Sequence, residues 1–145
     1  MKLLLQFFIA ITLILASSGA AKAQPVSEIV SDIKSYFGTA SFYADKFAGR
    51  KTANGDNYDP AKYTAACNVL PLGTWIKVTN LRNNKSIIVR INDRLHANMN
   101  RLVDLSKVAA NQLGYVQRGL AKVKVEVLGL RRPISSAIVG KDELD

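Results

Sequence analysis

The sequence contains very little cysteine and histidine: Cys67 is the one cysteine and His96 the one histidine among its 145 residues. A single cysteine excludes an intramolecular disulfide, so packing alone must stabilise the fold. The sequence shows no cluster of metal-ligating residues and no nucleotide-binding loop, so we expect no cofactor. A nucleophilic cysteine would need a base, and His96 is the one histidine that could serve. We therefore favour Cys67 as a small, partly buried residue.

Clusters of basic residues are also lacking, although the chain is basic overall. Its formal charge is +9, yet no run of Lys and Arg is longer than Arg131-Arg132. This pattern, together with the export signal described next, makes nucleic acid an unexpected partner. A basic exported protein is drawn to anionic surfaces such as wall polymers or lipid headgroups. The alternative is that the charge serves solubility only.

The amino terminus has the features of an export signal. Lys2 precedes an apolar run at residues 3–16, and residues 21–23 form an A-x-A cleavage signature before Gln24. A transmembrane anchor is the alternative, but the run is shorter than the roughly 20 residues that a span requires. We predict a signal peptide at residues 1–23, with the mature chain in the periplasm or outside the cell. Because no cysteine lies near the cleavage site, we do not expect a lipoprotein.

Apolar and polar residues alternate through the centre of the chain, and this period of two predicts β-strands. Residues 121–127 alternate valine with charged side chains, and residues 74–79 place Ile76 and Val78 on one face. Residues 86–91 form a return strand after a polar turn, and residues 38–43 form a first strand. These short strands and frequent turns indicate an all-β fold, a compact β-barrel.

One helix is predicted within this region, at residues 105–113. Ser106 can cap it and Gly114 can end it. We expect the barrel domain to span residues 38–129, with a leader segment at 24–37 and a polar tail at 130–145.

Six motifs in this region occur in a recognisable order. They are G-T-A-S-F-Y from Gly38, T-A-N-G-D, T-A-A-C, L-P-L-G-T-W-I-K-V-T-N-L, I-N-D-R and V-D-L-S. Together they resemble the RlpA-like double-psi β-barrel, the domain of bacterial rare lipoprotein A. The resemblance implies a six-stranded double-psi barrel. It also implies a lytic transglycosylase that cuts β-1,4 bonds between MurNAc and GlcNAc in peptidoglycan strands without stem peptides and leaves 1,6-anhydro ends.

The sequence departs from the family pattern at two site positions: Asp56 stands where such domains usually have Glu, and Cys67 where they usually have His. These changes support an alternative function, a catalytically silent wall-binding or wall-loosening module similar to expansin barrels. In either case the expected partner is peptidoglycan. A weaker alternative is a scaffold for cell-division or wall-remodelling proteins.

Asp93 is the first catalytic candidate. It ends the return strand and, by its spacing, shares one face of that strand with Ile87, Val89 and Ile91. It should therefore emerge at the barrel rim beside apolar side chains. A partly desolvated carboxyl holds its proton more readily and can protonate a glycosidic oxygen. The alternative is that Asp93 pairs with Arg94 or Arg101, or starts a turn. The resemblance favours catalysis, because the acidic site residue of the family falls here.

Asp56 is the second catalytic candidate. It follows an Asn-Gly turn and could face Asp93 across a groove, where two carboxylates divide the acid and base roles. A surface turn residue is the alternative. We predict that Cys67 lines the same groove.

The other predicted site residues are substrate-binding. His96 could replace the missing imidazole or be an exposed loop residue, and aromatic rings could stack on sugars or belong to the core. The substrate-binding set comprises Asn54, Tyr58, Cys67, Asn92, Arg94 and His96.

Overall fold

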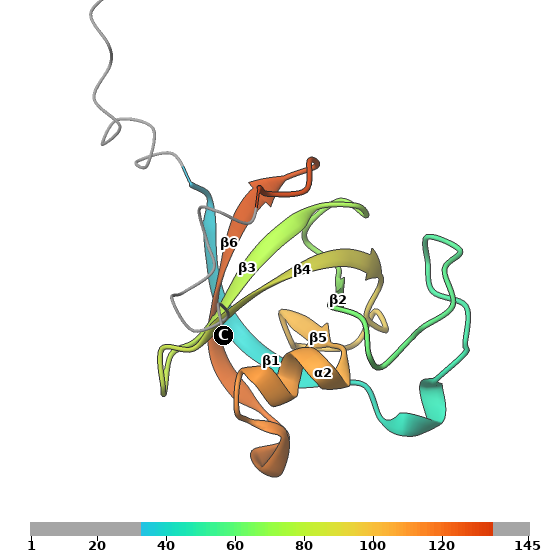
Figure 1. Cartoon of the computed structure of the whole chain (residues 1–145), viewed down its shortest axis with the longest axis horizontal. Coiled ribbons are helices and arrows are strands. Elements are labelled where there is room, and N and C mark those ends of the chain that lie inside the picture. The colour runs from blue at the N-terminus through green and yellow to red at the C-terminus, as the bar shows by residue number, and fades with distance from the viewer. Residues whose placement is uncertain (1–32, 135–145) are drawn as a thin grey trace, which may run out of the picture. The chain divides into compact units, whose positions relative to one another are not determined.

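A computed structural model describes residues 33–134, in which six strands form a closed barrel (Figure 1). The predicted signal peptide lies outside the described residues, as do the first part of the leader and most of the tail. No helix within residues 33–134 is long and apolar enough to cross a membrane. The strands are β1 (Ser35–Phe42), β2 (Thr64–Cys67), β3 (Trp75–Asn80), β4 (Ser86–Asp93), β5 (Val103–Leu105) and β6 (Ala121–Gly129).

The strand order around the barrel is β1-β5-β2-β4-β3-β6. Two neighbouring pairs, β1 with β5 and β2 with β4, are parallel, and the remaining pairs are antiparallel. Closure leaves no free sheet edge that could pair with another chain. The prediction of an all-β, six-stranded double-psi barrel is confirmed.

The barrel interior is filled by small and branched apolar side chains. Val123 and Val125 of β6 are fully buried, as are Ile76 and Val78 of β3, which confirms the alternation predicted for both strands. Burying a side chain of this kind contributes roughly 1.5–3 kcal/mol. With no disulfide available, this packing has to stabilise the barrel.

A short helix, α2 (Lys107–Gln112), packs its alanines against this core. It is shorter than predicted at both ends. Ser106 occupies the N-cap position but makes no side-chain capping hydrogen bond. Gly114 ends the helical segment with a φ of 73°, a left-handed conformation that glycine adopts without strain. Two 3-10 turns, η1 (Asp45–Phe47) and η2 (Val116–Arg118), also occur within residues 33–134.

The strand bounds differ from the prediction mainly at their ends. β1 begins at Ser35 and not at Gly38, so the last residues of the predicted leader belong to the barrel. β4 ends at Asp93, which was expected to end the return strand, two residues beyond the alternating segment at 86–91. β2 and β5 were not located from the residue pattern, because they are three or four residues long and nearly all their side chains are buried.

Gly38 provides a test of this packing. A Cβ atom on Gly38 would lie 2.6 Å from the Cβ of Leu102, a contact that real structures avoid. We expect Gly38→Ala to lower the free energy of unfolding by about 1–3 kcal/mol, because the backbone must shift to relieve the overlap. Urea denaturation measures this, with Ser35→Ala on the exposed end of β1 as the control. Equal stability of the two variants would contradict the observed β1–Leu102 contact.

Candidate active site

A register shift between β2 and β4 decides where Asp93 points. Ala65 pairs with Ile91, but the next residue, Ala66, pairs with Asp93, so Asn92 is an extra residue opposite the Ala65–Ala66 step. A bulge of this kind reverses the alternation of side chains beyond it. The prediction that Asp93 lies on the same face of the strand as Ile91 is therefore wrong. Asp93 shares the outer face with Ala66. Its side chain is half-buried.

Three donors bind the Asp93 carboxylate. The Tyr43 hydroxyl donates to Oδ2 at 2.7 Å. The backbone N–H groups of Ala53 and Arg94 donate to Oδ1 at 2.9 and 2.8 Å. Hydrogen bonds to a charged acceptor contribute roughly 1.5–3 kcal/mol each, so together they fix the orientation of the side chain.

Tyr43 directly follows β1, and two rings hold it in place. Its ring centroid lies 4.5 Å from that of Tyr58 and 5.9 Å from that of Phe47, in an edge arrangement with the latter. Burial, followed by the hydrogen bond to Asp93, raises the pKa of Tyr43, so the phenol stays protonated and remains a donor. From the sequence, aromatic rings were expected only to stack on sugars or to belong to the core, so the hydrogen bond from Tyr43 to Asp93 was not predicted. The place of Tyr43 at a strand end gave no signal of a partner 50 residues away.

The loop at residues 52–56 covers Asp93 and carries Asp56. Asn54 organises the loop: its side chain accepts from the Thr52 hydroxyl and the Asp56 N–H, and donates to Asp56 Oδ2 at 2.8 Å. The Asn54 N–H donates to the Asn92 carbonyl, which ties the loop to the end of β4. Asp56 and Asp93 therefore lie at the same end of the barrel.

Asp56 is exposed and ionised. The hydrogen bond from Asn54 is the main cause that lowers the pKa of Asp56, with smaller contributions from Asn92, Arg90 and Lys62. A carboxylate in this state suits the base role better than the acid role.

Cys67 does not line the groove, so that prediction is wrong. The side chain is fully buried and belongs to the core cluster. The preceding residue on β2, Ala66, faces outward. Cys67 pairs with the core residue Val103. A buried thiol cannot contact a ligand outside the barrel, which agrees with the preferred interpretation of Cys67 as a small packed residue.

The two arginines considered as partners of Asp93 bind elsewhere. The guanidinium of Arg94 donates to the carbonyls of Cys67 and Leu70, and so braces the loop after β2. The guanidinium of Arg101 makes a bidentate ion pair with Asp104 of β5, with Nε 2.8 Å from Oδ1 and Nη2 2.9 Å from Oδ2. Asp104 pairs with Ala66 across the sheet, so it lies on the same outer face as Asp93. Sequence reasoning did not select Asp104.

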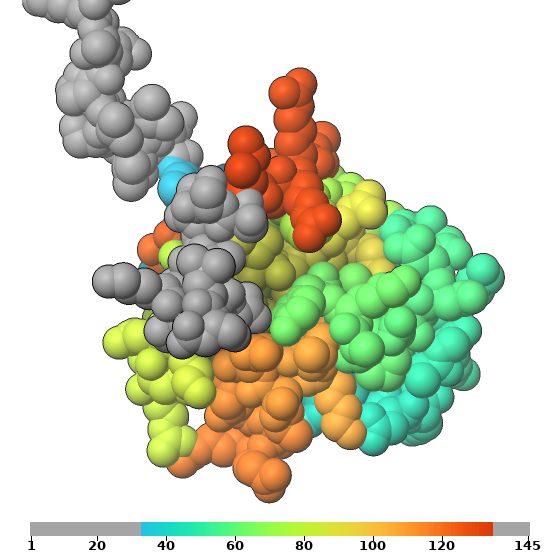
Figure 2. Space-filling view, in the orientation of Figure 1, coloured from blue at the N-terminus to red at the C-terminus, as the bar shows by residue number. Residues whose placement is uncertain are grey.

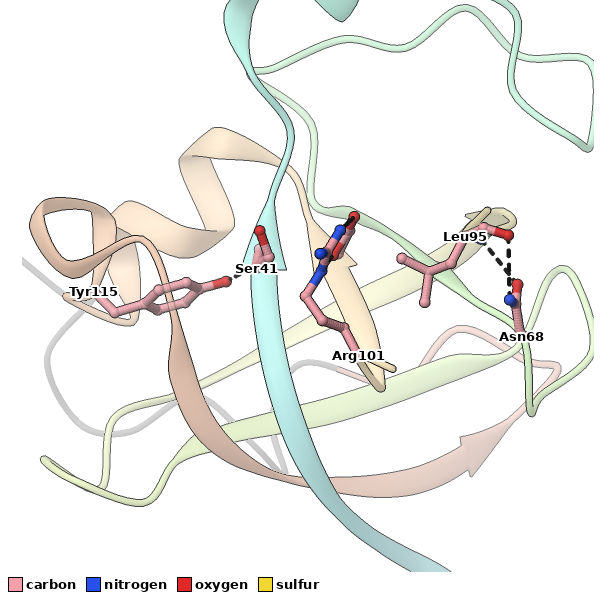
Figure 3. A network of polar contacts seen from close by, with 6 residues as sticks. Ser41, Asn68, Leu95, Arg101 and Tyr115 are labelled. Atoms are coloured by element: carbon pink, nitrogen blue, oxygen red, sulfur yellow. Dashed lines mark hydrogen bonds and ion pairs between the residues drawn. The ribbon is translucent and has the colours of Figure 1, made fainter. Parts of the chain in front are cut away.

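The loops after β2 and β4 are joined next to the site. Asn68 donates to the Leu95 carbonyl at 3.2 Å and accepts from its N–H at 2.9 Å, as Figure 3 shows. His96 follows Leu95 on the exposed part of the loop, where its Nδ1 accepts from the Asn98 N–H and its carbonyl accepts from the Met99 N–H.

Two other predicted substrate-binding residues are buried. Tyr58 is 4% exposed and its hydroxyl accepts from the Lys107 N–H, so it supports Tyr43. Asn92, also 4% exposed, is the bulge residue. Asn54 remains accessible. Within residues 33–134 no group of three or more His, Cys, Asp or Glu side chains could hold a metal ion.

This geometry can support acid–base chemistry on a polymer lying across the outer barrel wall. An oriented carboxyl group, Asp93, has a second carboxylate, Asp56, on the loop that covers it. Pairs of this kind act on glycosidic bonds.

Comparison with known proteins identifies the family. Residues 36–125 match the family model described as lytic transglycolase. The chain is 46% identical over 117 residues to the endolytic peptidoglycan transglycosylase RlpA of Pseudomonas aeruginosa, covering 75% of this chain and 34% of the relative. It is 47% identical over 100 residues to the RlpA of Neisseria meningitidis, covering 68% and 42%. The chain thus spans about two fifths or less of the length of these relatives.

Solved structures share the fold at low identity. An expansin from Clavibacter michiganensis matches with a TM-score of 0.54 and 19% identity, over 70% of this chain and 52% of that one. The Streptomyces papain inhibitor also matches with a TM-score of 0.54, at 20% identity, over 65% of this chain and 94% of that one. Motif order, barrel topology and the family match agree, and the chain belongs to the lytic transglycolase family of RlpA-like double-psi β-barrels.

Proposed function

We propose that this protein is an exported lytic transglycosylase that cleaves the β-1,4 bonds between MurNAc and GlcNAc in peptidoglycan strands without stem peptides. The observation that carries the proposal is the Asp93 carboxyl group, oriented by three donors on the outer wall of the barrel. The relatives named endolytic peptidoglycan transglycosylase support the reaction and, with it, a place in the cell envelope. Peptidoglycan is the proposed partner.

Asp93 carries the proton transfers in this mechanism. In its protonated form the Asp93 carboxyl group gives a proton to the glycosidic oxygen as the bond from that oxygen to the MurNAc anomeric carbon breaks, and Asp93 becomes the carboxylate. The C6 hydroxyl of the same sugar then attacks that carbon and returns its proton to Asp93. The product is a 1,6-anhydro end, and no water is consumed. Positioned proton transfer of this kind is worth about 10²–10⁴-fold in rate.

Asp56 acts as the second carboxylate. Its ionised state suits stabilisation of the positive charge that develops at the anomeric carbon. Because Asp is one methylene shorter than Glu, the Asp56 carboxylate lies roughly 1.5 Å further from the glycosidic bond than a Glu carboxylate would. A misplacement of this size slows a reaction without abolishing it. We therefore propose a slow enzyme.

A catalytically silent wall-binding module is the second candidate. Two observations favour it. The Asp56 carboxylate is engaged by Asn54, and the position usually held by His is a cysteine buried in the core. The oriented Asp93 carboxyl group favours the enzyme.

Substitution of Asp93 tests the reaction. We expect Asp93→Asn to abolish release of 1,6-anhydro products from purified peptide-free glycan strands, because the amide cannot deliver a proton. Binding of the strands should persist, since the shape of the side chain is kept. Mass spectrometry of the products and co-sedimentation with strands measure both properties. Equal product release by the variant and the wild type would refute the assignment. Release by neither protein, with binding intact, would favour the silent module.

Tyr43 tests how Asp93 is positioned. Tyr43→Phe removes one hydrogen bond to the carboxylate and keeps the ring that packs on Tyr58. The Tyr43 hydrogen bond becomes a bond to a charged group, worth roughly 1.5–3 kcal/mol, as Asp93 gives up its proton. We therefore expect kcat to fall about 10–100-fold with KM nearly unchanged. Tyr63→Phe, on an exposed tyrosine, is the matched control. An unchanged kcat would show that Tyr43 does not position Asp93.

The two departures from the family pattern should respond differently to reversal. Asp56 is exposed on its loop, so Asp56→Glu should extend the carboxylate toward the bond and raise the rate several-fold without loss of stability. Cys67 is fully buried, so Cys67→His overfills the core and should lower the free energy of unfolding by about 1–3 kcal/mol. Kinetic assays and thermal unfolding of the single variants measure these effects. A stable, faster Cys67→His variant would contradict the buried position.

A further inference from the structure

A basic cavity lies at the other end of the barrel from Asp93. Its volume is about 680 Å³, and its walls come from the β3–β4 turn, the segment after α2 and the start of β6. In Figure 1 the β3–β4 turn and the η2 segment lie near each other, away from the 52–56 loop. The cavity is lined by Thr39, Asn80, Arg82, Asn83, Gly114, Tyr115, Arg118, Leu120, Ala121 and Lys122.

The cavity has three cationic side chains and no acidic residue in its lining: Arg82, Arg118 and Lys122. Both arginines are exposed, and neither takes part in an ion pair within residues 33–134. The Lys122 ammonium donates to the Thr39 hydroxyl, a neutral group, at 2.9 Å. Lys85 adds a fourth cation at the edge, near Gly114. Cations gathered around one hollow favour binding of an anion with several acceptor oxygens.

The walls of the cavity are already held in position. The side-chain amides of Asn80 and Asn83 both donate to the Leu113 carbonyl, at 2.9 and 3.0 Å, and so fix the β3–β4 turn to the end of α2. The Tyr115 hydroxyl donates to the Ser41 carbonyl at 2.8 Å, which ties the other wall to β1. In Figure 3, Tyr115 reaches β1 from one side and Arg101 lies on the other. A ligand would therefore meet a formed site, which lowers the entropic cost of binding.

Exposed apolar side chains border these cations. Leu120 lines the cavity and is 53% exposed, and Leu81, beside Arg82, is 45% exposed. The Leu81 N–H donates to the Lys122 carbonyl, which places this leucine next to the third cation. In the space-filling view the β3–β4 turn projects from the molecular surface (Figure 2). Leucines among arginines and lysines match a bilayer interface, where phosphates and acyl chains lie together.

We propose that this cavity binds the phosphate groups of anionic phospholipids, with Leu81 and Leu120 entering the interface. Asp93 lies seven residues along β4 from Ser86, which is about 23 Å at the usual rise per residue. A protein held to a membrane at the cavity would thus keep its catalytic end free to face the peptidoglycan.

Vesicle binding by the mature chain tests the proposal. We expect co-sedimentation with vesicles that contain phosphatidylglycerol, weakened by salt, and little binding to pure phosphatidylcholine. Arg82→Gln with Arg118→Gln should weaken binding about thirtyfold, since each cation near an anionic surface contributes about fivefold. Leu120→Ser should weaken it further. The charge-matched control is Lys46→Gln with Arg50→Gln, on the exposed connection after β1.

Other outcomes would overturn the proposal. Equal loss in the control variant would show that overall charge is responsible and not the cavity. If soluble poly(glycerol phosphate) bound as tightly as vesicles and Leu120→Ser had no effect, the site would recognise a phosphate polymer and not a lipid surface. Cleavage of soluble glycan strands should be unchanged in the cavity variants, so this test is independent of the proposed catalysis.

Discussion

The register shift between β2 and β4 is the constraint on which the site depends. A regular ladder would direct the Asp93 side chain into the apolar interior, where an unpartnered carboxylate costs several kcal/mol. The extra residue, Asn92, turns Asp93 to the outer face. There the Tyr43 hydroxyl and two backbone N–H groups can reach it. Cys67 needs no such irregularity: it lies two residues after Ala65 on β2, and both side chains face the core by ordinary alternation.

The barrel topology brings the parts of this site together. β2 and β4 are parallel neighbours, as are β1 and β5, so the ends of strands distant in sequence meet at one place. Tyr43 follows the end of β1, while Asp93 ends β4 and is covered by the loop from residues 52–56. The closed sheet fixes these ends, and the loops add the polar groups. Regular alternation of side chains along the strands is therefore enough to build the core. The Asp93 side chain reaches the outer face only because of the bulge in β4.

The sequence predicted those parts of the fold in which one face is buried and the other exposed. β3 and β6 follow strict alternation, so Val78 and Val125 were correctly placed inside. β2 and β5 have no such contrast, and their existence was implied only by the family resemblance. The predicted orientation of Asp93 was wrong because a bulge leaves no mark in a single sequence. The Tyr43–Asp93 and Arg101–Asp104 pairs depend on tertiary contacts and on geometry that spacing does not reveal.

Catalysis by a proton from Asp93 requires that the bond to be cut lies at this carboxyl group. A crystal structure of the Asp93→Asn variant with a bound peptide-free glycan strand measures this directly. The account predicts a glycosidic oxygen within about 3 Å of the side chain at position 93, on the outer wall between Tyr43 and the 52–56 loop. A strand bound elsewhere on the barrel, with no glycosidic oxygen in reach of that side chain, would contradict it.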